Sequence, residues 1–115
     1  MAFDLRRYRT AAGDEPLTQW LSALPDRQAR ARILARLERL EVGNLGDARF
    51  LRDGVSELRI DWGPGYRVYF GRNGENTIVL LCGGNKRRQN ADIQRAVELW
   101  QEYESRKRRD PRANR

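Results

Sequence analysis

The chain has 115 residues, 39% hydrophobic and 34% charged, with no histidine, one cysteine and a formal net charge of +7 at pH 7. This length and composition fit one domain with its own core, and they exclude an internal disulfide, a histidine-based metal site and a long apolar membrane span. We expect no signal peptide, no nucleotide-binding glycine motif, no metal, no cofactor and no membrane partner, and therefore a cytoplasmic protein.

The positive charge is unevenly spread along the chain. From residue 106 to residue 115 six residues are basic and one is acidic, so the last ten residues carry most of the excess. A basic balance favours polyanionic or acidic partners. We predict one domain over residues 1–105, followed by a basic disordered tail over residues 106–115.

The first part of the chain predicts a strand and a helical hairpin. Residues 3–9 are typical of a strand, and apolar residues at helical spacing follow over residues 17–24. Pro25 and Asp26 interrupt this pattern before a longer amphipathic helix over residues 27–42. Its outward face carries a basic ridge that either contacts RNA or is an ordinary solvated helix face. The ridge consists of Arg32, Arg36 and Arg39.

The middle of the chain predicts a loop and then three antiparallel strands. The glycine-rich residues 43–54 indicate a loop with two apolar anchors. Residues 55–86 contain Gly-Pro-Gly at 63–65 and Asn-Gly at 73–74, which are turn signals between β-forming stretches. The third strand, over residues 77–82, is apolar throughout, as expected when both sheet faces are covered. The loop anchors are Phe50 and Leu51.

Cations are predicted to gather on one face of this sheet. Alternation along the first two strands places Arg59 and Arg67 on the same, more polar face. The third strand ends in a glycine turn, predicted to be flexible, that delivers three more cations toward that face. These are Lys86, Arg87 and Arg88. Each cation also has an ordinary interpretation, because strand arginines are usually solvated or paired, and Glu57 and Asp61 are close enough to pair.

The last predicted element is a C-terminal helix that begins at Asn90, a suitable capping residue. An apolar stripe at helical spacing marks one of its faces, which either packs on the sheet or forms a partner surface. The stripe consists of Ile93, Ala96, Val97, Trp100 and Tyr103. Cys82 ends the apolar third strand, and we expect it to be a small buried hydrophobe.

Four motifs in this order carry a family resemblance. They are ELRI at 57–60, GPGYRVYF at 63–70, VLLCGGNK at 79–86 and Q-x-x-D-I-x-x-A at 89–96. Their spacing and the order of the predicted elements resemble the RelE/ParE superfamily of bacterial toxins from type II toxin–antitoxin systems. Within it, the chain is similar to the HigB-like branch of addiction module killer proteins, over roughly residues 3–105.

The resemblance implies an α+β, RelE-like fold with an N-terminal strand, a helical hairpin, a three-stranded antiparallel meander and a C-terminal helix. It implies a cognate helix-turn-helix antitoxin of the HigA-like kind, a possible toxin–antitoxin heterotetramer, and the ribosome and mRNA as partners. In nuclease members, cations of the meander act on mRNA, which implies catalytic roles for Arg59, Arg67, Lys86 and Arg87. RNA contacts are expected from Arg88, Tyr66 and Tyr69, although both tyrosines also fit as half-buried sheet aromatics.

The chemistry of RNA cleavage explains why cations are required. Attack of a ribose 2′-hydroxyl on phosphorus builds negative charge that guanidinium and ammonium groups stabilise. An arginine stays protonated and is a poor base, and Ile93 stands near the place where some such nucleases carry a tyrosine or histidine. The leading hypothesis is a ribosome-dependent mRNA endoribonuclease that inhibits translation. The alternatives are a ParE-like, non-catalytic gyrase-inhibiting toxin and an inactive RNA-binding relative.

Overall fold

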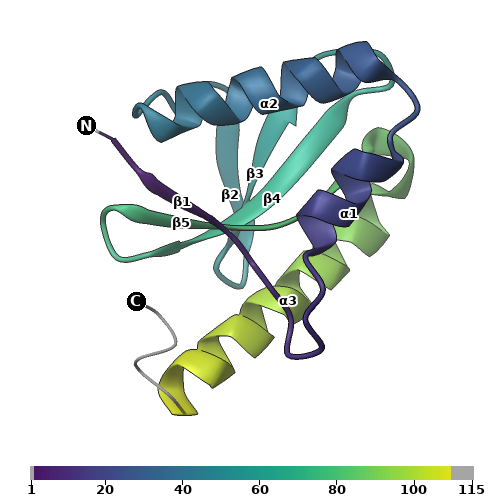
Figure 1. The fold of residues 1–115 in the computed structure, drawn as a ribbon. Helices are drawn as coiled ribbons and strands as arrows, with labels where there is room; N and C mark the ends of the chain where they lie inside the picture. Colours follow the sequence, from purple (N-terminus) through teal and green to yellow (C-terminus); the bar gives the residue numbers. More distant parts are fainter. Residues whose placement is uncertain (1, 110–115) are drawn as a thin grey trace.

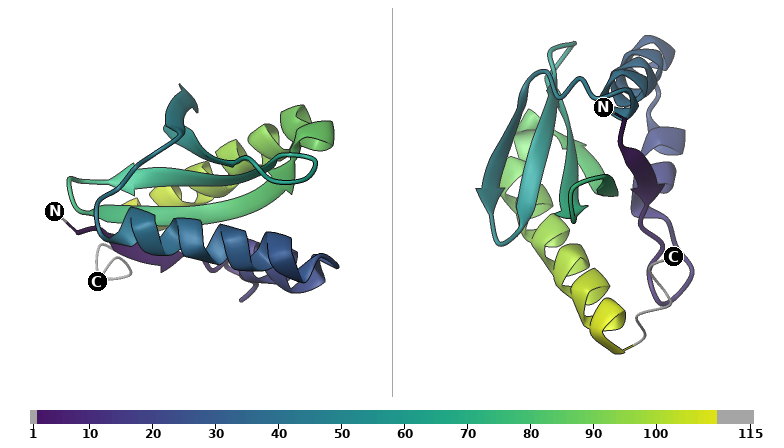
Figure 2. Two further views of the ribbon diagram at one scale, coloured as in Figure 1. Left: turned by 90° about the horizontal axis from the view of Figure 1, so that it is seen from above. Right: turned by 90° about the vertical axis from the view of Figure 1, so that its left-hand side faces the viewer.

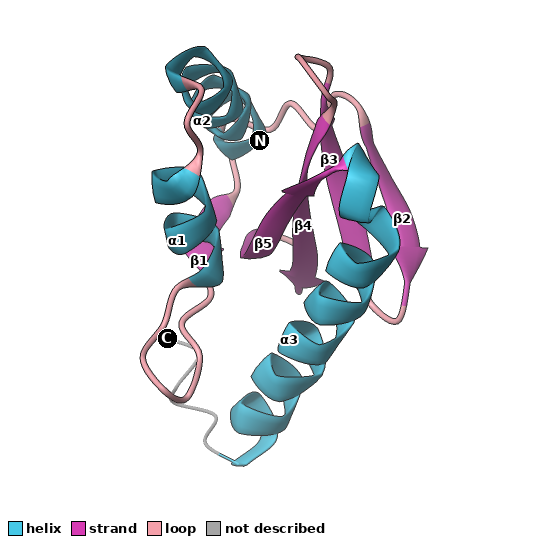
Figure 3. Ribbon diagram, turned by 90° about the vertical axis from the view of Figure 1, so that its right-hand side faces the viewer, coloured by secondary structure: helices cyan, strands magenta, loops and turns pink. Residues whose placement is uncertain are grey.

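A sheet of five strands lies between two helical layers in the computed structural model, which describes residues 2–109 (Figure 1). Helices α1 and α2 cover one face of the sheet and α3 crosses the other face (Figure 3). In chain order the elements are β1 (Asp4–Arg7), α1 (Pro16–Ala23), α2 (Arg27–Glu41), β2 (Ala48–Arg52), β3 (Val55–Ile60), β4 (Tyr66–Asn73), β5 (Thr77–Asn85), the 3₁₀ turn η1 (Lys86–Arg88) and α3 (Gln89–Arg109). The α+β, RelE-like fold predicted from the sequence is confirmed.

The strand order across the sheet is β1-β5-β4-β3-β2. Strand β1 pairs with β5 in parallel, whereas β3, β4 and β5 form the predicted antiparallel meander. Strand β2 was not expected, because it lies inside the predicted loop over residues 43–54 and pairs antiparallel with β3. Of the two predicted loop anchors, Leu51 packs against the core, but Phe50 is 67% exposed, so that prediction was wrong.

Each face of the sheet has its own apolar core, and Figure 2 shows helices on both sides of the sheet. On the α1–α2 side, Ile33 and Leu40 of α2 pack with Val68 and other inward residues of the strands. On the α3 side, Val97 and Trp100 pack with the strand residues of the opposite parity. The apolar stripe of the C-terminal helix is therefore core and not a partner surface. Alternation along β3 and β4 produces both cores, because successive strand residues point to opposite faces.

Cys82 is buried in the α3-side core, as the sequence predicts. Burial raises the pKa of its thiol to about 12, since a thiolate is poorly stabilised there. The side chain therefore remains a neutral thiol and behaves as a small apolar residue.

Helix α2 differs from its prediction in one side chain that bears on the basic ridge. Asp26 caps the helix by accepting hydrogen bonds from the backbone N–H groups of Gln28 and Ala29. Arg36 is only 7% exposed, and its guanidinium donates to the carbonyl oxygens of Asn44 and Leu45. These bonds hold residues 44 and 45 against α2. Of the predicted ridge, only Arg32 and Arg39 therefore face outward.

The segment after the third meander strand is more ordered than the sequence predicts. The glycines expected in a flexible turn belong to β5, and Lys86–Arg88 form η1, where the Asn85 side chain accepts from the Arg87 backbone N–H at 2.9 Å. Helix α3 then continues to Arg109, so residues 106–109 are helical rather than part of a disordered tail. The rest of that predicted tail, residues 110–115, lies outside the described residues. None of the helices in residues 2–109 is long and apolar enough to cross a membrane.

Candidate functional site

Arg59 and Arg67 stand directly opposite each other on the antiparallel strands β3 and β4. Directly opposed strand residues share one face of a sheet, so the predicted common face for these two arginines is confirmed. Their surroundings differ, because Arg59 is exposed whereas the Arg67 side chain is only 7% exposed. Two like charges in this arrangement repel unless an acid balances them.

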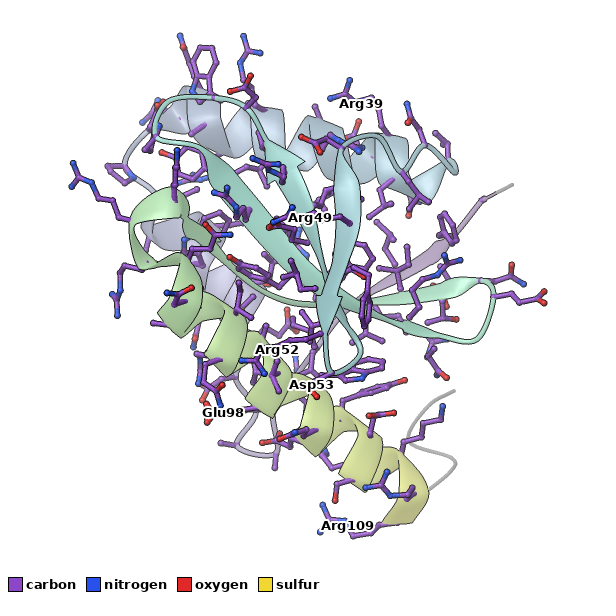
Figure 4. All side chains as sticks on the ribbon, turned by 180° about the vertical axis from the view of Figure 1, so that it is seen from behind. Arg39, Arg49, Arg52, Asp53, Glu98 and Arg109 are labelled. Carbon is purple, nitrogen blue, oxygen red and sulfur yellow. The ribbon has the colours of Figure 1, made fainter. Side chains whose placement is uncertain are left out.

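Glu57 provides this balance from a fully buried position on β3. Its Oε2 lies 3.3 Å from Arg67 Nε, and its Oε1 accepts a hydrogen bond from Arg49 Nε at 3.2 Å. The Arg67 contact is an ion pair without hydrogen-bond alignment, since neither of its two atoms has a hydrogen-bond partner. Arg49 reaches Glu57 from the directly opposed position on β2 (Figure 4). Arg67 is thus a largely buried and charge-compensated cation.

An open hollow of about 380 Å³ lies at the end of the sheet where β3 and β4 are joined by their turn. We call it the hairpin hollow. Arg59, Arg67 and Lys86 all line it, so the structure brings together three of the predicted site cations. Lys86 is held beside the turn because its backbone N–H donates to the carbonyl of Gly65 at 3.0 Å. Within the described residues, neither Arg59 nor Lys86 forms an ion pair, so their charges are available to an anion.

Two carboxylates also line the hairpin hollow: from the sequence, Asp61 was expected only as an ion-pair partner, and Asp47 was not expected there at all. Asp61 follows β3 directly, and its strand parity with Arg59 was the signal that placed it on this face. Asp47 precedes β2, where the backbone N–H of Arg59 donates to its carbonyl oxygen at 2.9 Å. Because β2 was not predicted, the sequence contained no usable signal for Asp47. The hollow therefore combines cations with groups that can accept a proton.

The remaining predicted cations lie outside the hairpin hollow. Arg87 and Arg88 are exposed on η1 and border a separate shallow surface together with Lys86. Among the described residues, only Lys86 lines both surfaces. Arg87 is thus separated from Arg59 and Arg67, and the predicted convergence does not include it.

The two predicted RNA-contacting tyrosines point to opposite faces of the sheet. Tyr66 is 8% exposed and packs edge-on against Trp20 at 6.0 Å between ring centroids, yet it also lines the hairpin hollow. Tyr69 is fully buried in the α3-side core, and burial raises the pKa of its hydroxyl. The predicted base stacking by Tyr69 is wrong because no face of its ring is accessible, and the residue is a core aromatic, more buried than the half-buried alternative expected.

A wider groove of about 740 Å³ adjoins the hairpin hollow on the side of α2. The two share four lining residues, which are Asp47, Arg59, Ile60 and Asp61. Arg32 and Arg39 of the α2 ridge border the groove, and Figure 4 shows Arg39 on the helix. The cations around Arg59 therefore continue onto α2, in a groove that Glu38 also lines.

The fold and this site define a class of protein: a small α+β protein of RelE-like fold with a cationic hollow at the end of its sheet. The family model of phage-derived Gp49-like proteins (DUF891) matches residues 19–102. A relative from Haemophilus influenzae, an uncharacterized protein, is 49% identical over 83 residues, which is 72% of this chain and 84% of the relative.

The chain belongs to the Gp49-like family of phage-derived proteins. This family is related to the toxins of toxin–antitoxin modules and is similar to the RelE superfamily. Membership in a toxin–antitoxin family implies an antitoxin partner. The match includes the whole meander and most of α3, so the hairpin hollow lies within the region that defines the family.

Proposed function

We propose that this protein is the toxin of a type II toxin–antitoxin module and inhibits translation as a ribosome-dependent mRNA endoribonuclease. The observation that carries the proposal is the meeting of Arg59, Arg67 and Lys86 in one open hollow. Membership in a toxin-related family supports it. A phosphodiester entering the hollow would meet two unpaired cations and one cation fixed by a buried acid.

In this proposal the three cations have different roles. Arg59 and Lys86, which form no ion pair among the described residues, bind the phosphate oxygens and stabilise the charge that develops at phosphorus. Arg67 is held by Glu57 and is a positioning residue, because its side chain is 7% exposed and its charge is balanced. Tyr66 provides a ring edge beside them.

The proton on the attacking 2′-hydroxyl also needs an acceptor. An arginine stays protonated at neutral pH and does not accept it. The carboxylates of Asp47 and Asp61 line the same hollow, and a carboxylate is a competent general base when it lies within reach of the hydroxyl. We assign the proton acceptor to this pair, and the ribosome would hold the mRNA in line for attack. The bond from phosphorus to the 5′-oxygen then breaks, which leaves a 2′,3′-cyclic phosphate, and the leaving 5′-oxygen takes a proton from the Lys86 ammonium or from water.

The proposed partners follow from the same surface. A helix-turn-helix antitoxin of the HigA-like kind would neutralise the toxin by covering the hairpin hollow and the adjoining α2 groove. An anionic face on that antitoxin would complement the cations of Arg59, Lys86 and Arg39. Two toxins and two antitoxins would then form the heterotetramer that the sequence resemblance implies.

The proposal is tested with Arg59→Ala and Lys86→Ala, expressed from an inducible promoter. Removing a group that stabilises transition-state charge lowers a catalytic rate by about 10²–10³-fold, so growth arrest and cut mRNA should both be lost. The matched control is Arg27→Ala, which removes an exposed arginine at the start of α2, away from the hollow. Mapping of mRNA 5′ ends measures cleavage, and cuts at wild-type levels in both hollow variants would show the site assignment to be wrong.

A ParE-like gyrase inhibitor is the second candidate function. The pairing of Arg67 with Glu57 favours it, because a non-catalytic inhibitor does not need three free cations. Induction would then produce a DNA-damage response without ribosome-phased mRNA cuts. An inactive RNA-binding relative would produce neither, although the purified protein would still bind RNA.

A further inference from the structure

A second cationic hollow, of about 230 Å³, lies between β1 and the C-terminal end of α3. We call it the β1–α3 hollow. Its ionisable lining is entirely basic apart from two tyrosines, since no carboxylate lines it among the described residues. The five cations are Arg6, Arg7, Arg9, Arg106 and Lys107. The hollow is therefore a stronger concentration of positive side chains than the hairpin hollow.

Neighbouring acids balance only part of this charge. Arg9 pairs with Glu15 at 3.1 Å and Arg106 lies 3.9 Å from Glu102, and Arg6 likewise has an acid partner. The other two cations form no ion pair among the described residues. Arg7 donates to the hydroxyl of Thr18 at 3.0 Å, with the Glu15 carboxylate close enough for their charges to interact, and the Lys107 ammonium donates to the side-chain oxygen of Asn73. Lys107 is thus oriented without an acidic partner, and Arg7 interacts with an acid only at longer range.

Hydrogen bonds fix the walls of the hollow in place. The Tyr8 hydroxyl donates to Glu102 and accepts from Arg106 at 3.0 Å, and Arg106 also donates to the backbone carbonyl of Arg9 at 2.7 Å. Burial, together with the Glu102 carboxylate, raises the pKa of Tyr8 to about 12, so the hydroxyl remains a donor at neutral pH. These bonds join the end of α3 to the end of β1. The cations are therefore pre-organised, which lowers the entropy lost when an anion binds.

We propose that the β1–α3 hollow binds the phosphate backbone of RNA at a second point, away from the hairpin hollow. The inference rests on the RNA substrate of the proposed function. Val79 lines one hollow and Lys86, which follows β5 directly, lines the other, and at about 3.3 Å per strand residue they lie roughly 23 Å apart. The two hollows therefore contact separate stretches of one RNA and do not hold neighbouring phosphates.

Phosphate fits this hollow better than an acidic protein segment does. The planar fork of a guanidinium matches two phosphate oxygens, and four of the five cations are arginines. The hollow is too small for a helix, whose diameter with side chains is about 10 Å. Tyr8 and Tyr103, arranged edge to face at 5.9 Å between centroids, add aromatic walls that suit a sugar or a base.

The test measures binding of a short, fluorescently labelled single-stranded RNA to the purified full-length protein, without ribosomes. The variant is Arg7→Gln with Lys107→Gln, because glutamine removes each charge but keeps a polar side chain that can donate hydrogen bonds. Each phosphate contact contributes about 0.7 to the slope of log affinity against log salt concentration for single strands. The slope should therefore fall by about 1.4, with roughly tenfold weaker binding near 0.1 M salt.

The matched control is Arg108→Gln with Arg109→Gln, which removes the same charge from exposed positions in the same last turns of α3. An equal change in the control would overturn the proposal, since net charge alone would then explain it. A poly-glutamate peptide that competes as well as unlabelled RNA would also overturn it, in favour of an acidic protein ligand. Should the double variant fail to fold, Lys107→Gln alone should lower the slope by about 0.7.

This binding experiment is separate from the cleavage test of the hairpin hollow. If Arg59→Ala and Lys86→Ala still cut mRNA, the proposed active site fails, but RNA binding at the β1–α3 hollow can still be read. If cleavage depends on the hairpin hollow but the Arg7 and Lys107 variant binds RNA like wild type, only the second contact fails.

Discussion

The hairpin hollow and the β1–α3 hollow are both cationic, but their charges are arranged in different ways. The hairpin hollow mixes cations with Asp47 and Asp61 in its lining, and the buried Glu57 stands behind Arg67. In the β1–α3 hollow no described lining residue is a carboxylate, and two of its cations form no ion pair among the described residues. The first arrangement can both stabilise a phosphate and accept a proton, whereas the second can only bind an anion.

The comparison shows why net charge is a poor guide to the reactive site. By counting cations alone, the β1–α3 hollow would rank above the hairpin hollow. Cleavage of RNA requires proton transfer as well as charge stabilisation, and arginines do not supply it. The position of the acids therefore separates a candidate catalytic site from a candidate binding site.

The largest expected effect concerns those acids. Asp47→Asn together with Asp61→Asn should lower mRNA cleavage on the ribosome by about 10²–10⁴-fold, the usual contribution of general acid–base catalysis. RNA binding should be unchanged or tighter, because two negative charges leave a phosphate-binding surface. The single variants then identify which carboxylate is the acceptor.

The control for this experiment is Asp53→Asn. Asp53 is an exposed acid in the turn between β2 and β3, it does not line the hollow, and asparagine tolerates its positive φ of 51° (Figure 4). Cleavage should stay at the wild-type rate. If the double variant also cleaves like wild type, the hairpin hollow is not the source of the proton acceptor.

The second-largest expected effect concerns Glu57, the buried acid that pairs with Arg67 of the hairpin hollow. Glu57→Gln leaves Arg67 largely buried without its balancing charge, and breaking a buried ion pair in this way lowers the free energy of unfolding by about 3 kcal/mol. Urea denaturation measures the change. Glu57→Leu combined with Arg67→Leu removes both charges and should be clearly more stable than Glu57→Gln. If Glu57→Gln lowered the free energy of unfolding by less than about 1 kcal/mol, water would be solvating the Arg67 charge in place of Glu57.

Much of the fold was predictable because its signals are local. Helical spacing of apolar residues identified the three helices, and the glycine turns at 63–65 and 73–74 separated the meander strands. Strand β2 escaped detection because it is a short edge strand flanked by glycines, with Phe50 exposed and arginines on either side of its apolar pair. Such a strand is specified by pairing with β3, and a pattern in its own five residues does not reveal it.

For the site, alternation along the strands predicted which residues share a face of the sheet, but it did not predict which of them are buried. Alternation correctly placed Arg59 and Arg67 on one face, but it does not show that α3 crosses that face and buries Tyr69. Burial is set by a segment far away in the sequence. Arg36 was misplaced for a related reason, because the carbonyl groups of residues 44 and 45 hold it inward. The β1–α3 hollow joins residues about 100 positions apart, for which the sequence offers no local signal.

The smallest expected effect concerns Tyr8, which lines the β1–α3 hollow. The pKa of Tyr8 is raised from 10.0 to about 12, so the folded protein retains this proton in a pH range where the unfolded chain has lost it. The contribution of Tyr8 to stability is therefore complete below pH 10 and decreases between about pH 10 and pH 12. Two pKa units at about 1.4 kcal/mol each set an upper limit of about 3 kcal/mol on this contribution, and solvent screening lowers it.

Tyr8→Phe removes this titration and keeps the ring. At pH 7 the variant should lose about 1 kcal/mol with the hydrogen bonds to Glu102 and Arg106. Between pH 10 and pH 12 the unfolding free energy of the variant should fall less steeply with pH than that of wild type. The difference between the two slopes should correspond to close to one proton. If wild type and variant showed the same slope of unfolding free energy against pH, the Tyr8 hydroxyl would not be hydrogen-bonded between α3 and β1. The β1–α3 hollow would then form only when an anion binds, unlike the hairpin hollow with its buried acid.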